Sequence, residues 1–161
     1  MGAGSPLRIR VEPKRELLVG NAVYRGLDRA VELLTLASRP DIRIKTLALG
    51  KLTLTLDYTS QRLLGLLAFT PSGRWKVEGA EKPPSPDAEG SLSFLLDFAG
   101  DDFYYADLRP RFEFHEESGS LRLRFSESGA LAVRAGNCLI VGISRSGELS
   151  DLWLERLKFR A

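Results

Sequence analysis

Short runs of alternating apolar and polar residues recur along this chain and limit what it can fold into. The stretch 110–160 shows the pattern best, with Phe112 and Phe114 before a Glu-Glu-Ser-Gly turn and Leu121 and Leu123 after it. Successive side chains of a strand point to opposite faces of a sheet. Each run therefore predicts a strand with one face in a core and the other toward water. A second hairpin is predicted over residues 138–159.

One helix is predicted, near residues 27–38. Its apolar residues fall at i, i+3, i+4, i+7 and i+10, which places them on one helical face. They are Leu27, Ala30, Val31, Leu34 and Ala37. Arg39-Pro40 would end this helix, because a residue before proline is disfavoured in the helical region.

Prolines mark a connector at residues 82–90. This stretch holds three prolines and no large apolar side chain, so it predicts neither a helix nor a central strand. We expect one domain over residues 1–161, with two similar halves, 7–80 and 91–160, joined by this connector. A surface loop within one domain would have the same composition.

The fold class predicted from these patterns is mainly β, a β-rich α+β domain. The strands would form an antiparallel sandwich or a closed barrel, with the one helix covering a side or an end. Parallel βαβ winding is disfavoured, because a single helix cannot supply the crossovers.

The two halves also share a sequence pattern. Residues 7–19 resemble residues 111–123: an alternating strand, a charged turn and a returning apolar strand. Residues 47–69 resemble residues 131–153 in the same way. We therefore hypothesise an internal duplication, with the helix inserted in the first copy, although alternating strands also resemble one another by chance.

Three segments of the C-terminal part carry a resemblance to a known family. They are Phe112-Glu-Phe-His-Glu-Glu, Leu121-Arg-Leu-Arg-Phe-Ser and Ile140-Val-Gly-Ile-Ser-Arg-Ser-Gly-Glu-Leu. Residues 111–159 resemble a family of small uncharacterised prokaryotic proteins, filed as domains of unknown function. Leu152-Trp153-Leu154-Glu155 departs from the Gly-Ile-Glu segment of that family. The resemblance implies no activity, because the family has no agreed one.

Charge and cysteine content limit the expected cellular location and the expected partners. The net charge is +2, and the acids gather in residues 81–117, so we expect no nucleic-acid partner. The single cysteine, Cys138, excludes an internal disulfide and suits a reducing compartment. No apolar run is long enough to span a bilayer, and residues 1–6 lack a signal-peptide pattern, so we expect a cytoplasmic protein without a membrane partner.

Catalytic chemistry has few candidates. His115 is the only histidine and no Gly-x-Ser-x-Gly motif is present. His115 alternates with Glu113 and Glu117, a geometry that can bind a divalent cation, but a tight zinc site needs further His or Cys ligands. We therefore predict no catalytic residue, no metal site and no cofactor, and keep a hydrolase-like or metal-dependent enzyme at this cluster as an alternative.

The most interface-like segment combines aromatic rings with carboxylates. Its residues are Asp101, Asp102, Phe103, Tyr104, Tyr105 and Asp107. Carboxylates are costly to bury unpaired, so we expect them at a solvated rim while the rings contact a partner. The basic N-terminal segment of a second copy is a suitable partner; it contains Arg8, Arg10, Lys14 and Arg15.

The function predicted from the sequence is that of a non-catalytic interaction protein that self-associates as a homo-oligomer or binds another protein. A β-barrel that binds a small apolar ligand is the first alternative, and the enzyme named above is the second. The sequence itself identifies no biochemical activity.

Overall fold

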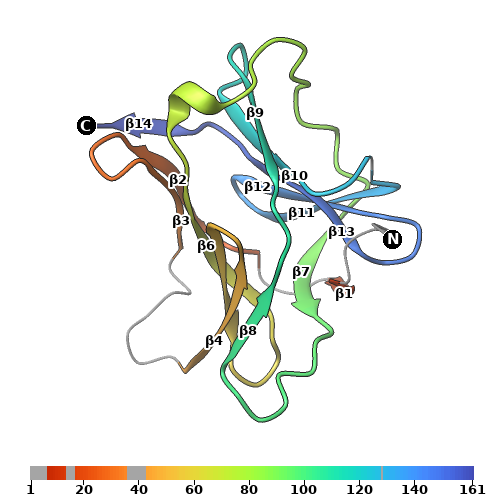
Figure 1. The fold of residues 1–161 in the computed structure, drawn as a ribbon. Coiled ribbons are helices and arrows are strands. Elements are labelled where there is room, and N and C mark those ends of the chain that lie inside the picture. The colour runs from red at the N-terminus through yellow and green to blue at the C-terminus, as the bar shows by residue number, and fades with distance from the viewer. Residues whose placement is uncertain (1–6, 14–16, 36–42, 128) are drawn as a thin grey trace.

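Two seven-stranded sheets pack face to face as a sandwich in the computed structural model (Figure 1). The structure describes residues 7–13, 17–35, 43–127 and 129–161. The predicted β-rich class is confirmed. The strand order of each sheet is open, with no strand pairing between its two ends, so the alternative of a closed barrel is wrong.

The first sheet has the strand order β14-β2-β3-β6-β5-β4-β8. Its strands are β2 (Gly20–Arg25), β3 (Ala30–Thr35), β4 (Ile44–Leu49), β5 (Leu52–Asp57), β6 (Leu63–Phe69), β8 (Phe103–Ala106) and β14 (Lys158–Arg160). The second sheet has the order β1-β7-β11-β12-β13-β10-β9. Its strands are β1 (Ile9–Pro13), β7 (Ala88–Phe94), β9 (Arg111–His115), β10 (Ser120–Arg124), β11 (Leu131–Gly136), β12 (Leu139–Ile143) and β13 (Leu149–Leu154).

The core lies between the sheets and is built from the alternation seen in the sequence. Leu52, Leu54 and Leu56 of β5 are fully buried, and so are Leu121 and Leu123 of β10. All five belong to one cluster that draws on both sheets. Burying a leucine side chain stabilises a fold by roughly 1.5–3 kcal/mol. The apolar side of each strand therefore holds the sandwich together.

The predicted helix at residues 27–38 is wrong over its described part. Residues 26–29 form a turn and residues 30–35 form β3, while residues 36–38 lie outside the described residues. Leu27, the first member of the helical stripe, is 87% exposed. β3 pairs with β2 on one side and β6 on the other, so sheet hydrogen bonding outweighs the helical spacing of a short apolar run.

The sheets are mixed rather than purely antiparallel, which corrects the predicted arrangement. β8 pairs parallel with β4, β7 with β11, and β14 with β2. Each of these pairs joins strands that are distant in the sequence, and local alternation carries no information about such pairing. The only helix within the described ranges is the single turn of 3-10 helix at Ser72–Arg74. No helix in this part of the chain is long and apolar enough to cross a membrane.

Each sheet contains the same five-strand arrangement. The order is β2-β3-β6-β5-β4 in the first sheet, which we call the N-terminal unit, and β9-β10-β13-β12-β11 in the second, the C-terminal unit. In both units a hairpin is followed by a three-strand meander whose last strand returns beside the hairpin. The strand orders agree, as an internal duplication requires. Duplication as the origin of this agreement stays a prediction.

The two units also agree in local detail. A register shift interrupts β5–β6 between Thr55 and Leu56, and another interrupts β12–β13 between Gly142 and Ile143, at the same place in the meander. Loop conformations match as well. Positive φ angles occur at the last residue of both hairpin turns and at the fourth residue of both meander loops. These residues are Arg29 (φ 54°), Gly119 (67°), Gln61 (58°) and Gly147 (84°).

Each unit is completed by segments from the other half of the chain. β8 and β14 flank the N-terminal unit, although they follow it by many residues (Figure 1). In return, Leu18 bridges Gly136 and Lys76 bridges Glu113, both in parallel, at the two sides of the C-terminal unit. Residues 88–90, which the sequence placed in the proline-rich connector, belong to β7.

Candidate functional site

The predicted contact segment 101–107 contains β8, the end strand of the first sheet. Phe103 and Tyr105 are 54% and 56% exposed, and Asp101, Asp102 and Asp107 are exposed too. The ring of Tyr104 packs on Phe98, with ring centroids 5.7 Å apart. The strand therefore presents two of its three rings to solvent, and we call the five exposed residues the β8 surface.

The backbone of β8 leaves one side available for further pairing. Thr46 N–H donates to the carbonyl oxygen of Asp102 at 2.8 Å, on the side where β8 meets β4. On the other side, no strand among the described residues pairs with β8. An end strand with an open side and exposed rings is a template for association. Asp107 Oδ1 lies 3.7 Å from Arg109 Nε, so one carboxylate of the surface already has a nearby cation.

The proposed basic partner segment is described only in part. Arg8 and Arg10 are exposed on the segment that contains β1, the end strand of the other sheet. Arg8 Nη2 donates to the Ser146 carbonyl oxygen at 3.3 Å. Lys14 and Arg15 lie outside the described residues.

The His115 cluster is not assembled as a metal or catalytic site. His115 Nδ1 lies 2.7 Å from Ser118 Oγ, within the turn that follows β9. Glu113 is buried, and both of its carboxylate oxygens form ion pairs, with Arg122 and with Arg124. Within the described ranges, no three His, Cys, Asp or Glu side chains come together as a metal site.

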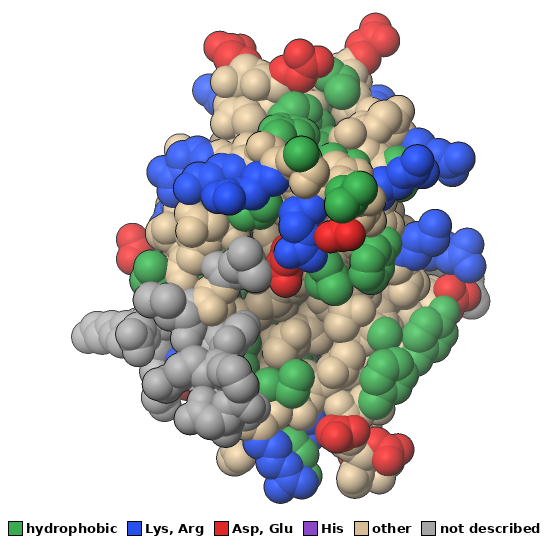
Figure 2. Space-filling view, turned by 90° about the vertical axis from the view of Figure 1, so that its left-hand side faces the viewer, with side chains coloured by type: hydrophobic (Ala, Val, Ile, Leu, Met, Phe, Trp, Pro, Cys, Tyr) green, Lys and Arg blue, Asp and Glu red, His purple; other side chains and the backbone are tan. Residues whose placement is uncertain are grey.

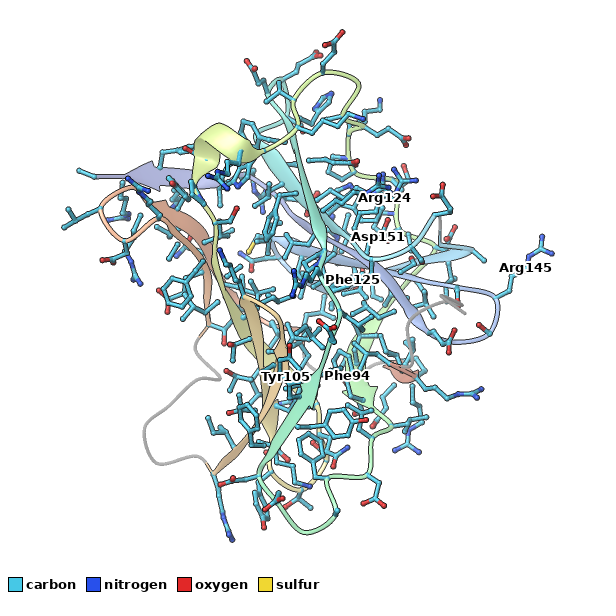
Figure 3. The ribbon with its side chains drawn as sticks, viewed as in Figure 1. Phe94, Tyr105, Arg124, Phe125, Arg145 and Asp151 are labelled. Carbon is cyan, nitrogen blue, oxygen red and sulfur yellow. The ribbon has the colours of Figure 1, made fainter. Side chains whose placement is uncertain are left out.

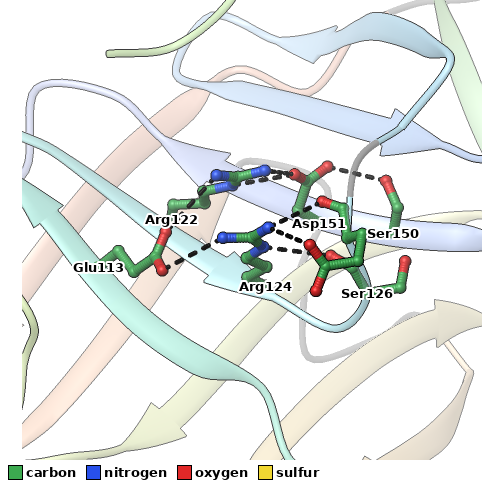
Figure 4. A network of polar contacts seen from close by, with 7 residues as sticks. Glu113, Arg122, Arg124, Ser126, Ser150 and Asp151 are labelled. Carbon is green, nitrogen blue, oxygen red and sulfur yellow. Dashed lines mark hydrogen bonds and ion pairs between the residues drawn. The ribbon is translucent and has the colours of Figure 1, made fainter. Parts of the chain in front are cut away.

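A buried polar network lies where the sequence predicted a solvent-facing strand side. Arg122 donates from Nε and Nη2 to Asp151 Oδ2, at 2.9 and 2.6 Å, and lies 3.5 Å from Glu113 through Nη1. Arg124 Nη1 lies 3.6 Å from the other oxygen of Glu113. Figure 4 shows the two guanidinium groups side by side between the carboxylates. Glu113, Arg122 and Asp151 all have exposed fractions of 6% or less.

This network forms part of a row that crosses five strands on the outer face of the second sheet. Cross-strand pairing places its members directly opposite one another: Glu113, Arg122, Trp153, Ile140 and Arg134. The Arg122 guanidinium lies 4.6 Å from the Trp153 ring centroid, a cation–π contact. Trp153, Ile140 and Ala132 form a small apolar cluster separate from the main core.

A cavity of about 670 Å³ lies over Arg122 and Trp153 of this row, with the proline-rich connector as its opposite wall. The connector is fixed by Asp87, whose N–H donates to the Ala132 carbonyl at 2.7 Å and whose carboxylate accepts from the Ala132 N–H at 2.9 Å. Gly142 forms part of the floor. A Cβ there would overlap the Asp151 carboxylate, so glycine makes the room that this carboxylate occupies.

Burial affects the ionisation of Asp151 and of Cys138, which lies in the main core. Desolvation raises the pKa of the Asp151 carboxyl, and the hydrogen bonds from Arg122 oppose that rise. Burial also raises the pKa of the Cys138 thiol, which lies 3.5 Å from the Gly20 carbonyl oxygen. A thiol with a raised pKa is a poor nucleophile, so Cys138 has the character of an unreactive core residue.

The sequence contained one signal for this network. Arg122 and Asp151 are charged residues inside strongly apolar strands, in the segments Ser-Leu-Arg-Leu-Arg and Leu-Ser-Asp-Leu-Trp-Leu. Alternation assigns both to the side facing away from the core. Nothing local to either strand shows that the connector folds back over that side.

Comparisons with known proteins give no match, either to a family model or to a curated protein. The resemblance of residues 111–159 to a family of unknown function therefore stays an expectation. The two candidate sites of this chain are the β8 surface and the buried polar network of the second sheet. Figure 3 shows that they lie apart, with Tyr105 on β8 and Asp151 with Arg124 near β10 and β13.

Proposed function

We propose that this protein is a non-catalytic interaction protein that self-associates through the β8 surface. The observation that carries this proposal is the exposure of Phe103 and Tyr105 on a strand with an open side. Aromatic rings are enriched at the centres of protein interfaces, and their burial would add to the backbone hydrogen bonds of a new strand pair. The surrounding carboxylates would form a solvated rim.

Charge favours β1 of a second copy as the partner of β8. Two copies of β8 paired with each other would bring the carboxylates of Asp102 and Asp107 together, which is unfavourable. β1 ends the other sheet, with Arg8 exposed just before it and Arg10 exposed on it. Its first residue, Ile9, already donates to the Gly147 carbonyl, so a partner strand would pair with the residues after Ile9. Reciprocal pairing of β8 with β1 gives a closed, isologous dimer. The face with β2, β3 and β4 is less suited to such pairing, because its basic, acidic and apolar groups are interspersed (Figure 2).

The oligomeric state tests this proposal. Light scattering at tens of micromolar should show a dimer for the unmodified protein and a monomer for the double variant Phe103→Ser/Tyr105→Ser. Tyr104 is kept, because its ring contacts Phe98 and contributes to the fold. Phe69→Ser is the matched control, since Phe69 is 51% exposed on β6 and lies outside the β8 surface. A monomeric unmodified protein would refute self-association.

Charge reversal tests the choice of partner strand. Asp102→Arg and Arg10→Asp should each weaken the dimer, and the two changes combined should restore it, because they exchange the two charges across the interface. The dimer should also weaken as salt is raised. If the double variant is weaker than either single variant, β1 is not the partner. The cytoplasmic location stays a prediction.

A further inference from the structure

A cavity of about 330 Å³ opens at the end of the sandwich where the chain crosses from the first sheet to the second. Figure 1 shows this crossing, which leads from β8 directly to β9. One side of the cavity is formed by the turn between β4 and β5 and by the end of β6, and the other by segment 109–112. Its apolar lining consists of Leu52, Phe69, Pro71, Pro110 and Phe112. This volume lies at the lower end of the range of small-molecule sites.

The charged residues that line this cavity are all basic. They are Lys51, Arg74 and Arg109, and no Asp or Glu occurs among the described lining residues. Lys51 and Arg74 take part in no salt bridge between residues that the structure describes. Arg109 Nε has one nearby carboxylate oxygen, Asp107 Oδ1, at 3.7 Å. An anion at this cavity would therefore meet cations that the fold leaves largely unpaired.

We propose that this cavity binds a small amphipathic anion, which places an apolar body against the lining and one anionic head among the three basic side chains. The body would bury apolar surface, including that of Phe69, which is 51% exposed. The head would be held by charge, as carboxylates and phosphates are held by Arg and Lys elsewhere. This proposal goes beyond self-association, because no residue of the β8 surface lines the cavity.

The matching corner of the C-terminal unit is closed by a direct hydrogen bond. There the Gly20 N–H donates to Asn137 Oδ1 at 2.9 Å. The strand registers place Pro110 in the position of Gly20, and Gly50 in the position of Asn137. Proline has no N–H and glycine has no side chain, so the same hydrogen bond cannot form in the N-terminal unit. The cavity therefore lies where the chain lacks a contact that its other half makes.

The residues beside this missing contact bring basic side chains to the cavity. Lys51 is exposed, whereas its match in the C-terminal unit, Cys138, is buried. A Cβ on Gly50 would lie only 3.5 Å from Arg109 Cγ, so the Arg109 side chain lies against the turn between β4 and β5. The open corner and two of its three cations therefore arise from the same exchange of residues.

The tryptophan side chains give a direct test. Trp75 Nε1 donates to Thr70 Oγ1 at 3.1 Å, and Thr70 lines the cavity, whereas Trp153 does not. In nitrogen–proton correlation spectra of the full-length protein at low salt, 3-phenylpropanoate serves as the probe. It should shift the Trp75 indole signal saturably, with a Kd at or below about 1 mM. The Trp153 signal should stay in place, and Trp75→Phe assigns the two signals.

Matched probes separate the two parts of the ligand. 3-Phenylpropanamide keeps the body without the charge, and acetate keeps the charge without the body. Calorimetry should show that each binds at least about tenfold more weakly than 3-phenylpropanoate. Raising the salt from about 50 to about 300 mM should weaken the binding of 3-phenylpropanoate several-fold. Equal binding of the amide would leave no role for the cations, and equal binding of acetate would reduce the site to a basic surface, so either result overturns the proposal.

Charge-removing variants test the position of the site. Lys51→Gln, Arg74→Gln and Arg109→Gln change exposed side chains, and each should weaken 3-phenylpropanoate binding by up to about fivefold. The triple variant should weaken it by about tenfold or more. Arg145→Gln is the matched control, because Arg145 is exposed in the turn between β12 and β13 and does not line the cavity. Unchanged binding by the triple variant would overturn the proposal.

Two further variants distinguish this proposal from self-association. Phe69→Ser removes part of the apolar lining, so it should weaken 3-phenylpropanoate binding while the oligomeric state stays as it is. Phe103→Ser/Tyr105→Ser should separate the dimer and keep the binding. If 3-phenylpropanoate moves the Trp75 signal of neither the unmodified protein nor this double variant, the cavity is not a site for an amphipathic anion, whatever the oligomeric state.

Discussion

Two guanidinium nitrogens of Arg122, Nε and Nη2, converge on a single carboxylate oxygen of Asp151, at 2.9 and 2.6 Å. The other Asp151 oxygen accepts from Ser150 Oγ at 3.0 Å. A carboxylate with a fully buried side chain is thus held by both of its oxygens. This contact links β10 to β13 on the side of the sheet that faces away from the core.

Replacing Asp151 should be among the most destabilising single changes in the chain. Asp151→Asn leaves the Arg122 charge buried without its main partner, and we expect the free energy of unfolding to fall by about 3–5 kcal/mol. Urea denaturation measures this loss. Glu32→Gln, which breaks the half-exposed pair with Arg25, should cost less than about 1 kcal/mol. If the free energy of unfolding falls by similar amounts in the two variants, the buried pair contributes no more to stability than the half-exposed pair.

Replacing Arg122 and Asp151 together should cost much less stability than replacing Asp151 alone. Arg122→Met/Asp151→Leu removes both charges together and keeps comparable volume. We expect this double variant to recover most of the stability lost by Asp151→Asn. Equal instability of the double variant in urea would instead show that the ion pair itself stabilises the fold.

Gly142 should tolerate no side chain. A Cβ at this position overlaps the Asp151 carboxylate, so Gly142→Ala forces the ion pair or β12 to move. Overpacking of this kind costs about 1–3 kcal/mol or more. Gly73→Ala is the control, because open space surrounds that position, and its effect should stay within about 0.5 kcal/mol. Thermal unfolding of both variants gives the comparison.

Arg29 has a positive φ at the position where the matching hairpin of the C-terminal unit has Gly119. Both Arg29 and Gly119 have positive φ at the last residue of a hairpin turn. Since this conformation costs a side-chain-bearing residue roughly 1–2 kcal/mol, Arg29→Gly should raise the free energy of unfolding by up to about 1 kcal/mol. Gln61→Gly should lower it instead, because Gln61 Nε2 donates to the carbonyls of Phe94 and Leu96. If Arg29→Gly lowers the free energy of unfolding, the backbone at Arg29 is not strained.

The pH dependence of stability should contain a contribution from Asp57. Hydrogen bonds from the Ser60 N–H and hydroxyl and the Thr59 N–H lower the pKa of its carboxyl below the ordinary value of 3.8. A lowered folded-state pKa gives stability that is fully present above pH 3.8 and is lost as the pH falls through the folded value. Asp57→Asn should therefore flatten the acid side of a denaturation-against-pH curve. An unchanged acid side would contradict this assignment.

The parts of the fold that sequence alone could predict are those set by local alternation. Leu121 and Leu123 alternate with polar residues in the sequence, and both are fully buried in the core. The error at residues 27–38 has a local cause, because a short apolar run fits helical and strand periods alike. Val31 is buried in β3, whose neighbours on both sides decide the outcome.

Of the two candidate sites, one could be predicted from the sequence and the other could not. Phe103 and Tyr105 could be singled out by composition, since rings among carboxylates suit an exposed strand. The network of Arg122 and Asp151 could not, because it depends on the connector, which is distant in sequence from both residues. The parallel strand pairs were missed for the same reason.

The exchange of segments between the two halves sets the order in which the chain can complete its structure during synthesis. β2 is made early, yet its parallel neighbour β14 spans Lys158–Arg160. β4 is likewise without its parallel neighbour until β8 has been made. A nascent N-terminal unit on the ribosome therefore exposes the open side of β4 until β8 has been made, and the open side of β2 until β14 has been made. During that interval each open strand side is a template for pairing with a neighbouring nascent chain.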